Sequence, residues 1–224
     1  MMLGKVNTLR VQPSPTADAD MRLERLSANP VVPVWNDITA HGNNGTPSDP
    51  TILSDFVFDG VVDFVNTAFV GNPQDPSKPW TMGIWCIRES TNTGNVGIAG
   101  TRSGLTGWEL RDMNALALDQ LDFDCFPFLR TSNVIPAYSD DKWHYITISW
   151  TPGAPATLKG YGDGVPHFSG TVASNYGVSA LAFVFGKSPT IFWDGKIDTA
   201  RLYSRVLSDD EIMRDYLVGM AAHQ

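Results

Sequence analysis

Residues 193–211 read WDGKIDTARLYSRVLSDDE, and this stretch decides the fold class. Its first part carries apolar residues at strand-like spacing, whereas its second part carries the signals of a helix start. Ser208 and Glu211 have the spacing of a capping box, and Leu207 and Ile212 have that of a hydrophobic staple. The stretch therefore predicts a strand that leads into one short C-terminal helix.

The strand and the helix carry further signals of how they pack. Apolar residues change phase between Ile197 and Ala200, so we expect a β-bulge there. Gly219 stands where a glycine commonly ends a helix. The helix is expected to close one end of the domain. The side chains expected to pack inward are Ile212, Tyr216 and Leu217.

The preceding part of the chain has the pattern of an all-β domain. Twenty Gly and fifteen Pro separate short apolar runs, and charged residues make up only 18% of the sequence. Residues 80–88 and 143–150 are apolar on both faces, so we expect two central strands that are covered on both sides. Further strands are expected at 56–59, 61–65, 95–99, 108–112, 121–126, 156–161, 181–185 and 197–203.

Length and side-chain volume favour a single domain. An all-β domain of 224 residues commonly has one core, and 42% hydrophobic residues with seven Trp can fill two layers. Residues 1–30 are expected to form an N-terminal arm or an irregular first strand, and residues 31–224 the β-sandwich. Cys86 and Cys125 are expected to be buried thiols, with a disulfide between them as the alternative.

The charge and the apolar runs exclude several classes of partner. The net charge of −8 repels phosphate backbones, so no nucleic-acid partner is expected. No run reaches the roughly 18 apolar residues of a membrane-spanning helix, so no membrane partner is expected. The N-terminal residues lack the apolar run of a secretion signal, so we expect synthesis in a host cytoplasm without export.

Several motifs, in this order, carry a family resemblance. They read WNDITAHGNNGT at 35–46, FDGVVDFV at 58–65, DDKWHYITISW at 140–150, YGDG at 161–164 and FWDGKIDTARLYSRVLSDDEI at 192–212. Together they resemble the laminin-G-like modules of the concanavalin A-like lectin/glucanase superfamily, which occur in lectins, pentraxins and phage structural proteins. The resemblance implies a two-sheet antiparallel jelly-roll sandwich with one short C-terminal helix.

The resemblance also implies a possible calcium ion at the rim of the sandwich. Calcium takes roughly six to eight oxygen ligands, which carboxylates and loop carbonyls supply. The alternative is that these aspartates shape tight turns, because three of them precede a glycine. No other cofactor is expected. The candidate metal ligands are Asp59, Asp63, Asp163, Asp194 and Asp198.

Glycan binding is the second candidate activity. Exposed aromatic rings stack on sugars, and four aromatic residues lie in or near expected turns. Packing in the core is the alternative for each of them. The candidate ligand-binding residues are Trp108, Tyr138, Tyr176 and Trp193.

Catalysis is not expected. Glucanases of the superfamily that this sequence resembles carry Glu-x-Asp-x-x-Glu on one strand. This sequence lacks the motif. Asp122 and Asp124 share a strand face, but a solvated strand surface explains them.

Two functions remain open. The fold is normally used outside cells, yet the chain lacks an export signal and a disulfide framework, and its N-terminal residues have the character of a docking arm. We therefore expect a non-catalytic surface protein of a virus particle, located on a capsid, tail or fibre, that contacts other virion proteins or assembles as a homo-oligomer. The alternative is an extracellular lectin-like module of a multidomain cellular protein that binds glycans, with or without calcium.

Overall fold

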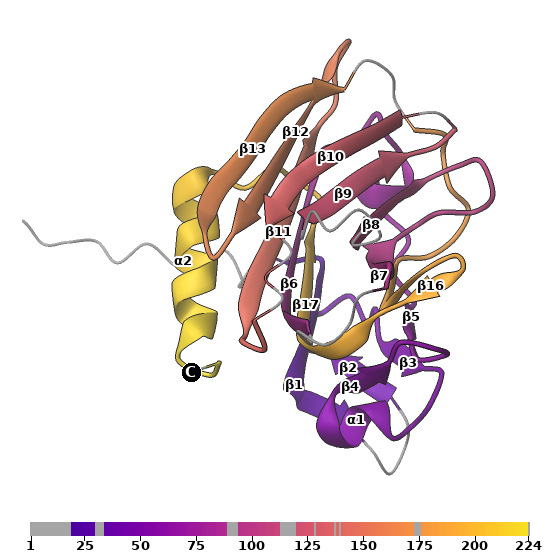
Figure 1. Ribbon diagram of the computed structural model, residues 1–224, viewed down its shortest axis with the longest axis vertical. Coiled ribbons are helices and arrows are strands. Elements are labelled where there is room, and N and C mark those ends of the chain that lie inside the picture. The colour runs from indigo at the N-terminus through magenta and orange to yellow at the C-terminus, as the bar shows by residue number, and fades with distance from the viewer. Residues whose placement is uncertain are drawn as a thin grey trace, which may run out of the picture.

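The structure is a computed structural model, and antiparallel strands in two layers dominate it (Figure 1). The C-terminal helix packs outside one layer. The described residues are 19–29, 34–88, 94–112, 120–127, 129–136, 138, 140–172 and 176–223.

One sheet runs through almost the whole fold, in the order β10-β9-β8-β7-β14-β5-β3-β2-β1-β17-β6-β11-β12-β13, with β4 beside β17. The first layer contains β1 (Met21–Asn29), β4 (Val57–Asp59), β6 (Trp80–Arg88), β11 (His144–Thr151), β12 (Ala156–Gly162), β13 (Val165–Val172) and β17 (Asp194–Tyr203). The second layer contains β5 (Val65–Thr67), β7 (Val96–Gly100), β8 (Trp108–Asp112), β9 (Gln120–Cys125), β10 (Leu129–Pro136) and β14 (Val184–Phe185). The short strands β2 (Val34–Asp37) and β3 (Gly45–Pro47) join the layers, and β15 (Lys187–Ser188) pairs with β16 (Ile191–Phe192) as a separate ribbon.

Large aromatic side chains hold the two layers together. Trp80 of β6 stacks on Trp108 of β8 with ring centroids 4.8 Å apart, and Trp150 of β11 lies 6.4 Å from Phe123 of β9. All four side chains are buried, and each such ring removes a large apolar area from water. The expected antiparallel jelly-roll sandwich is confirmed.

The C-terminal helix α2 (Asp209–Met220) begins as its sequence predicts. The Ser208 hydroxyl accepts the N–H of Glu211, while the Glu211 carboxylate accepts the N–H of Ser208. Leu207 and Ile212 are buried together beside the cap. The capping box is therefore confirmed. Two shorter helical segments, α1 (Ile52–Asp55) and η2 (Asn72–Gln74), were not expected.

The far end of α2 differs from the prediction. Gly219 lies inside the helix, where a β-carbon would sit 2.2 Å from Nε1 of Trp85. Close packing on the indole, rather than helix termination, therefore explains this glycine. Tyr216 stacks on Trp85 with centroids 5.5 Å apart, as expected of an inward residue. Leu217 is 50% exposed, so its expected inward packing is wrong.

A buried polar cluster fixes α2 on the first layer. The Asp215 side chain accepts hydrogen bonds from the hydroxyls of Tyr145 at 2.5 Å and Tyr203 at 3.0 Å. It also accepts one from Nη1 of Arg201 at 2.7 Å, and Nη2 of Arg201 reaches Glu24 at 3.1 Å. Strand β11 is thus covered by the core on one face and by α2 on the other, as its sequence predicted.

Two strand predictions are corrected. Residues 61–64 form a turn rather than a strand, because Oδ1 of Asp59 accepts the N–H groups of Val61, Val62 and Asp63 and curls the chain. Asp122 and Asp124 are 2% and 4% exposed, so the expectation of a solvated face on β9 is wrong. The predicted β-bulge is confirmed as a register shift between residues 197 and 199 against β6.

Part of the N-terminal segment forms a strand, and both cysteines are free thiols. Residues 21–29 form β1, which pairs with β17 and β2, whereas residues 1–18 lie outside the described residues. Cys86 and Cys125 are free buried thiols, as expected, and burial raises the pKa of both. Among the described residues, no helix has the length and apolar character needed to span a membrane.

Candidate functional site

The candidate site is a pocket on the outer face of the second layer, which we call the Glu109 pocket. In register, Asn66 of β5 lies opposite Val184 of β14, Val184 opposite Gly100 of β7, and Gly100 opposite Glu109 of β8. The neighbours of these residues along each strand point into the core, so this row faces outward. Gly100 lines the floor, and a β-carbon there would lie 2.5 Å from the carbonyl oxygen of Trp108, so β7 and β8 pack closely at this point.

The ribbon β15–β16 forms one wall of the pocket. It packs so closely on β7 that a β-carbon at Gly97 would lie 2.1 Å from the backbone nitrogen of Ser188. The cavity has a volume of about 540 Å³, within the range of small-molecule sites. Its lining residues are Asn66, Gly100, Thr101, Arg102, Ser103, Gly104, Glu109, Leu181, Ala182, Val184, Lys187, Ser188 and Pro189.

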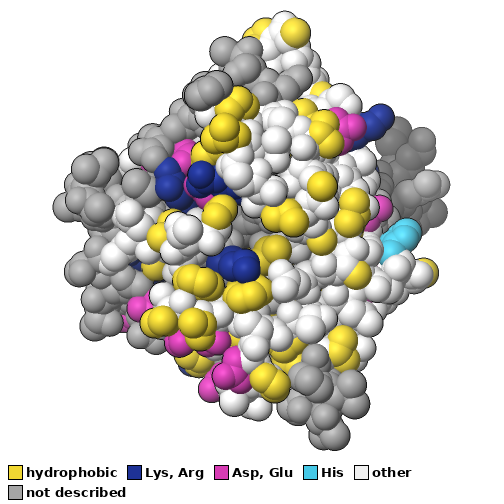
Figure 2. All heavy atoms as spheres, turned by 90° about the vertical axis from the view of Figure 1, so that its right-hand side faces the viewer, with side chains coloured by type: hydrophobic (Ala, Val, Ile, Leu, Met, Phe, Trp, Pro, Cys, Tyr) yellow, Lys and Arg dark blue, Asp and Glu magenta, His cyan; other side chains and the backbone are white. Residues whose placement is uncertain are grey.

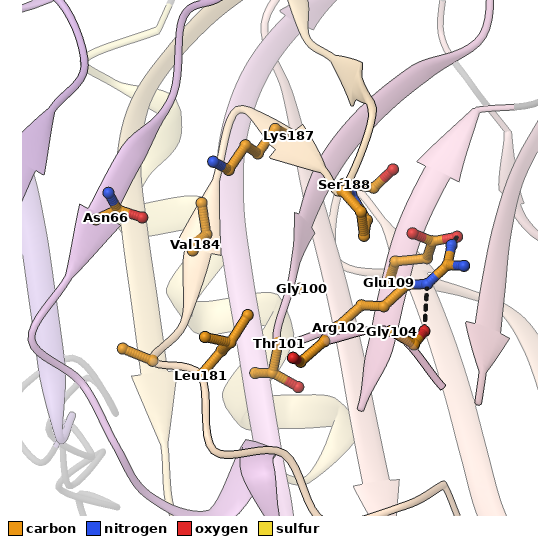
Figure 3. Close-up of a pocket in the computed structure, with 13 residues that line it drawn as sticks. Asn66, Gly100, Thr101, Arg102, Gly104, Glu109, Leu181, Val184, Lys187 and Ser188 are labelled. Atoms are coloured by element: carbon orange, nitrogen blue, oxygen red, sulfur yellow. Dashed lines mark hydrogen bonds and ion pairs between the residues drawn. The ribbon is translucent and has the colours of Figure 1, made fainter. Parts of the chain in front are cut away.

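The lining combines apolar and hydrogen-bonding groups. Figure 3 shows Leu181 and Val184 beside the centre, Asn66 at one end and Glu109 at the other. Figure 2 shows this side of the molecule, where basic side chains lie among apolar ones. Hydroxyl and amide groups come from Ser188, Ser103 and Asn66. The pocket can therefore bind a ligand that has both hydroxyl groups and apolar faces.

Glu109 is the most buried charged group of the pocket, with a side chain that is 0% exposed. Its Oε1 accepts a hydrogen bond from Nη1 of Arg102 at 2.9 Å, and Nη1 of Arg111 lies 3.5 Å away. Its Oε2 is buried and has no hydrogen-bond partner among the described residues. An unpaired buried acceptor costs roughly 1–3 kcal/mol, which a ligand donor would recover.

A second charged residue lies at the Asn66 end of the pocket. Nζ of Lys187 is 3.1 Å from the centroid of the Phe64 ring, and partial burial lowers the pKa of this ammonium group. Figure 3 shows the Lys187 side chain extended along the upper edge, with its amine on the side of Asn66.

Neighbouring carboxylates on β9 join the same outer face. Asp124 lies opposite Glu109 in register, and Asp122 lies opposite Arg111. The Arg111 guanidinium forms an ion pair with Asp124 as well as with Glu109. These buried aspartates are thus part of a charged layer beside the pocket, which explains why they are not solvated.

Three of the five predicted calcium ligands meet at the turn after β4. Asp59 lies opposite Asp194 in register, and Oδ2 of Asp63 accepts the N–H of Asp59. The carboxylates bind backbone N–H groups of the turn, and repulsion from Asp59 adds to the burial that raises the pKa of Asp63. Among the described residues, no three His, Cys, Asp or Glu side chains are grouped so as to hold a metal ion.

The other two predicted ligands contact histidines elsewhere on the first layer. Asp163 binds Nδ1 of His144 at 2.7 Å, and Nε2 of His144 lies 2.9 Å from Asp140. Tyr138 stacks on the same imidazole with centroids 4.0 Å apart. Asp198 binds Nε2 of His223 at 2.6 Å. The structure therefore divides the five aspartates among three places.

Three of the four candidate aromatic residues pack in the core, which is the alternative to ligand binding that the sequence left open for each of them. Trp108 and Trp193 are 0% exposed and Tyr176 is 2% exposed. Their polar atoms are satisfied inside the protein, as when Nε1 of Trp108 donates to the carbonyl of Pro73 at 2.8 Å. Of the four, Tyr138 alone keeps partial exposure, and it lies away from the Glu109 pocket.

Comparison with known families identifies the fold family. The model of the concanavalin A-like lectin/glucanases superfamily matches residues 59–213. The chain belongs to this superfamily. No curated protein matches this sequence.

Solved structures with the concanavalin A-like fold cover nearly the whole chain. The binding domain of botulinum neurotoxin serotype D matches with a TM-score of 0.65 and 15% identity over 92% of this chain and 52% of that chain. The receptor binding domain of botulinum neurotoxin D matches with a TM-score of 0.67 and 15% identity, over 92% and 54%. A mutant of Trypanosoma rangeli sialidase displaying trans-sialidase activity matches with a TM-score of 0.65 and 16% identity, over 95% and 35%. The chain thus spans about half the length of the neurotoxin domains, and the likeness shows the fold alone.

Sequence reasoning missed the residues that build the pocket of this concanavalin A-like domain. Glu109 and Lys187 stand in no motif, and no periodic signal distinguishes them. The one usable signal is the apolar–polar alternation of Trp108-Glu109-Leu110-Arg111, which places Glu109 and Arg111 on the outer face of β8.

Proposed function

We propose that this chain is a non-catalytic carbohydrate-binding module whose glycan occupies the Glu109 pocket. The observation that carries the proposal is the outward row from Asn66 to Glu109, which sets an apolar centre between hydrogen-bonding ends. Sugars present hydroxyl groups around apolar C–H faces, and such a lining complements both. The neurotoxin structures with this fold are named as receptor binding domains, which supports a binding role.

The charges beside the pocket favour binding over hydrolysis. A glycosidase needs one carboxyl group that holds a proton and a second that acts as nucleophile or base. Glu109 contacts two guanidinium groups, and Asp124 forms an ion pair with Arg111. Both carboxylates are engaged in ion pairs with guanidinium groups, so neither stands free beside the pocket to act on a substrate. We therefore expect no release of reducing sugar from β-glucans in an assay of the purified protein.

The test uses a substitution that fills the pocket and leaves the fold intact. Val184→Phe places a ring in the cavity over the floor at Gly100, because Val184 lies opposite Gly100 and lines the cavity. Val165→Phe is the matched control, since Val165 is a 49% exposed strand residue in the other layer. Binding is first screened on a glycan array, and the affinity of each positive glycan is then measured by isothermal titration calorimetry.

We expect the wild-type protein and Val165→Phe to bind the same glycans with equal affinity. Val184→Phe is expected to weaken binding at least tenfold while its melting temperature stays unchanged. Loss of binding in both variants, or in neither, would contradict the assignment of the glycan to this pocket. The absence of binding to every glycan on the array would overturn the proposed function.

A second proposed role is that of a surface component of a virus particle, as a homo-oligomer or in contact with other virion proteins. The supporting observation is that adjacent residues on α2, Leu217 and Val218, are 50% and 53% exposed, which suits a contact surface for assembly. Mass spectrometry of purified particles and sedimentation of the isolated protein test this role. A protein that stays monomeric at high concentration and copurifies with no particle would refute it.

A further inference from the structure

Among the described residues, no anion pairs with Lys187, whereas the other cations of the Glu109 pocket have anionic partners. Arg102 binds Glu109 at 2.9 Å, and nearby Arg111 binds Glu109 and Asp124. The ammonium group of Lys187 makes no hydrogen bond or ion pair with a described residue, and its contact is the Phe64 ring. A half-buried lysine with no counter-charge attracts an anion, and partial burial strengthens that attraction by lowering the local dielectric.

The opposite end of the pocket offers an acceptor. Glu109 lines the pocket, and its buried Oε2 has no partner among the described residues, so a hydroxyl or other donor of a ligand that reaches this oxygen would satisfy it. The two ends therefore require different groups on one ligand. An anionic group suits the Lys187 end, and a hydrogen-bond donor suits the Glu109 end.

The separation of the two ends sets the length of the ligand. The row from Asn66 to Glu109 crosses the four neighbouring strands β5, β14, β7 and β8. Four strands at a spacing of about 4.8 Å cover roughly 14 Å. A single sugar ring is shorter than this row, so a ligand that reaches both ends has more than one ring.

We infer that the Glu109 pocket binds an acidic oligosaccharide, with its negatively charged group on Lys187 and a hydroxyl group of another ring on Oε2 of Glu109. This inference rests on the proposed glycan-binding function and specifies its ligand class. The apolar side chains of Leu181 and Val184 would lie under the sugar rings between the two polar ends.

Titration calorimetry with sialyllactose, sulfated lactose and neutral lactose tests the inference. We expect each acidic ligand to bind at least tenfold more tightly than lactose, and the preference to shrink as salt rises. Lys187→Met is expected to abolish the preference, whereas Lys187→Arg retains it. Lys78→Met is the control for net charge, because Lys78 is exposed and does not line the pocket. The tighter of the two acidic ligands identifies carboxylate or sulfate as the anionic group.

The outcomes separate this inference from the proposed function. Lactose binding that Val184→Phe weakens, with no preference for acidic ligands or no effect of Lys187→Met, would overturn the inference and leave glycan binding intact. Equal losses in Lys187→Met and Lys78→Met would show a general charge effect and would also overturn it. The absence of binding to every glycan would overturn the proposed function itself.

Discussion

The Asp215 cluster yields a quantitative prediction about the attachment of α2. Replacing Asp215 by Ala leaves the buried guanidinium of Arg201 without its 2.7 Å partner and leaves the hydroxyls of Tyr145 and Tyr203 without an acceptor. Removing one member of a buried ion pair costs about 3–5 kcal/mol. Arg201 keeps its contact with Glu24 at 3.1 Å, so we expect a loss near 3 kcal/mol, at the low end of that range.

Urea unfolding followed by tryptophan fluorescence measures this loss. The change in the free energy of unfolding is obtained from the shift of the urea midpoint, provided that the dependence of this free energy on urea concentration is unchanged. A loss of about 3 kcal/mol corresponds to a fall in melting temperature of about 6–12 °C for a domain of this size. Asp215→Asn keeps an acceptor for one hydroxyl but removes the charge, so a smaller loss is expected. Asp210→Ala on the exposed side of the same helix is the control, with an expected loss below about 1 kcal/mol.

The interpretation of the cluster fails if Asp215→Ala loses less than about 1 kcal/mol or no more than Asp210→Ala. Such a result would mean that water or a rearranged Arg201 replaces the lost contacts. It would also mean that α2 is held mainly by the packing of its apolar and aromatic side chains.

Other predictions concern pH, capping, the pocket wall and the thiols. Burial lowers the pKa of His144, but hydrogen bonds to Asp163 and Asp140 outweigh it and raise the pKa overall. The stability that His144 contributes is therefore full below about pH 6.5, the pKa of an unfolded histidine, and is lost as the pH rises through the raised pKa of the folded protein. His144→Gln should therefore lower the melting temperature more at about pH 6 than at about pH 9. Ser208→Ala should cost about 1 kcal/mol in urea unfolding, because one end of the capping box is lost. Gly97→Ala should displace the ribbon β15–β16, seen as faster hydrogen exchange over residues 187–192. Cys86 and Cys125 should react with a thiol reagent only after denaturation, because both are buried and their thiol pKa values are raised.

The sequence predicted the fold well because its motifs act locally. Asp59 shapes its turn through N–H groups two to four residues away, and Asp37 does the same for Thr39 and Asn43. Ser208 and Glu211 cap their helix within one turn. Such contacts join near neighbours in the chain, so a short stretch of sequence contains both partners.

The Glu109 pocket could not be predicted because its parts are distant in sequence. Its floor joins residues near 66, 100, 109 and 184, and only the pairing of β5, β14, β7 and β8 brings them into one row. The burial of Asp122 and Asp124 was missed for the same reason, since simple alternation along β9 does not reveal the charges of β8 beside it. The position of an aromatic residue in an expected turn does not tell a ligand-binding ring from a packed one, and Trp193 lies within the core and donates to the carbonyl of Lys196.

The two-stranded ribbon β15–β16 lies outside the pairing of the main sheet, although it forms a wall of the pocket. It is held by packing on Gly97 and by the hydrogen bond from Gly186 to the carbonyl of Ile98. Side chains at Lys187 and Pro189 can therefore be exchanged without replacing a buried residue, whereas Ser188 is buried. The wall of the pocket can thus vary in sequence while the pairing of the main sheet is kept, whereas the floor residues Val184 and Glu109 belong to that pairing and vary only at a cost to folding.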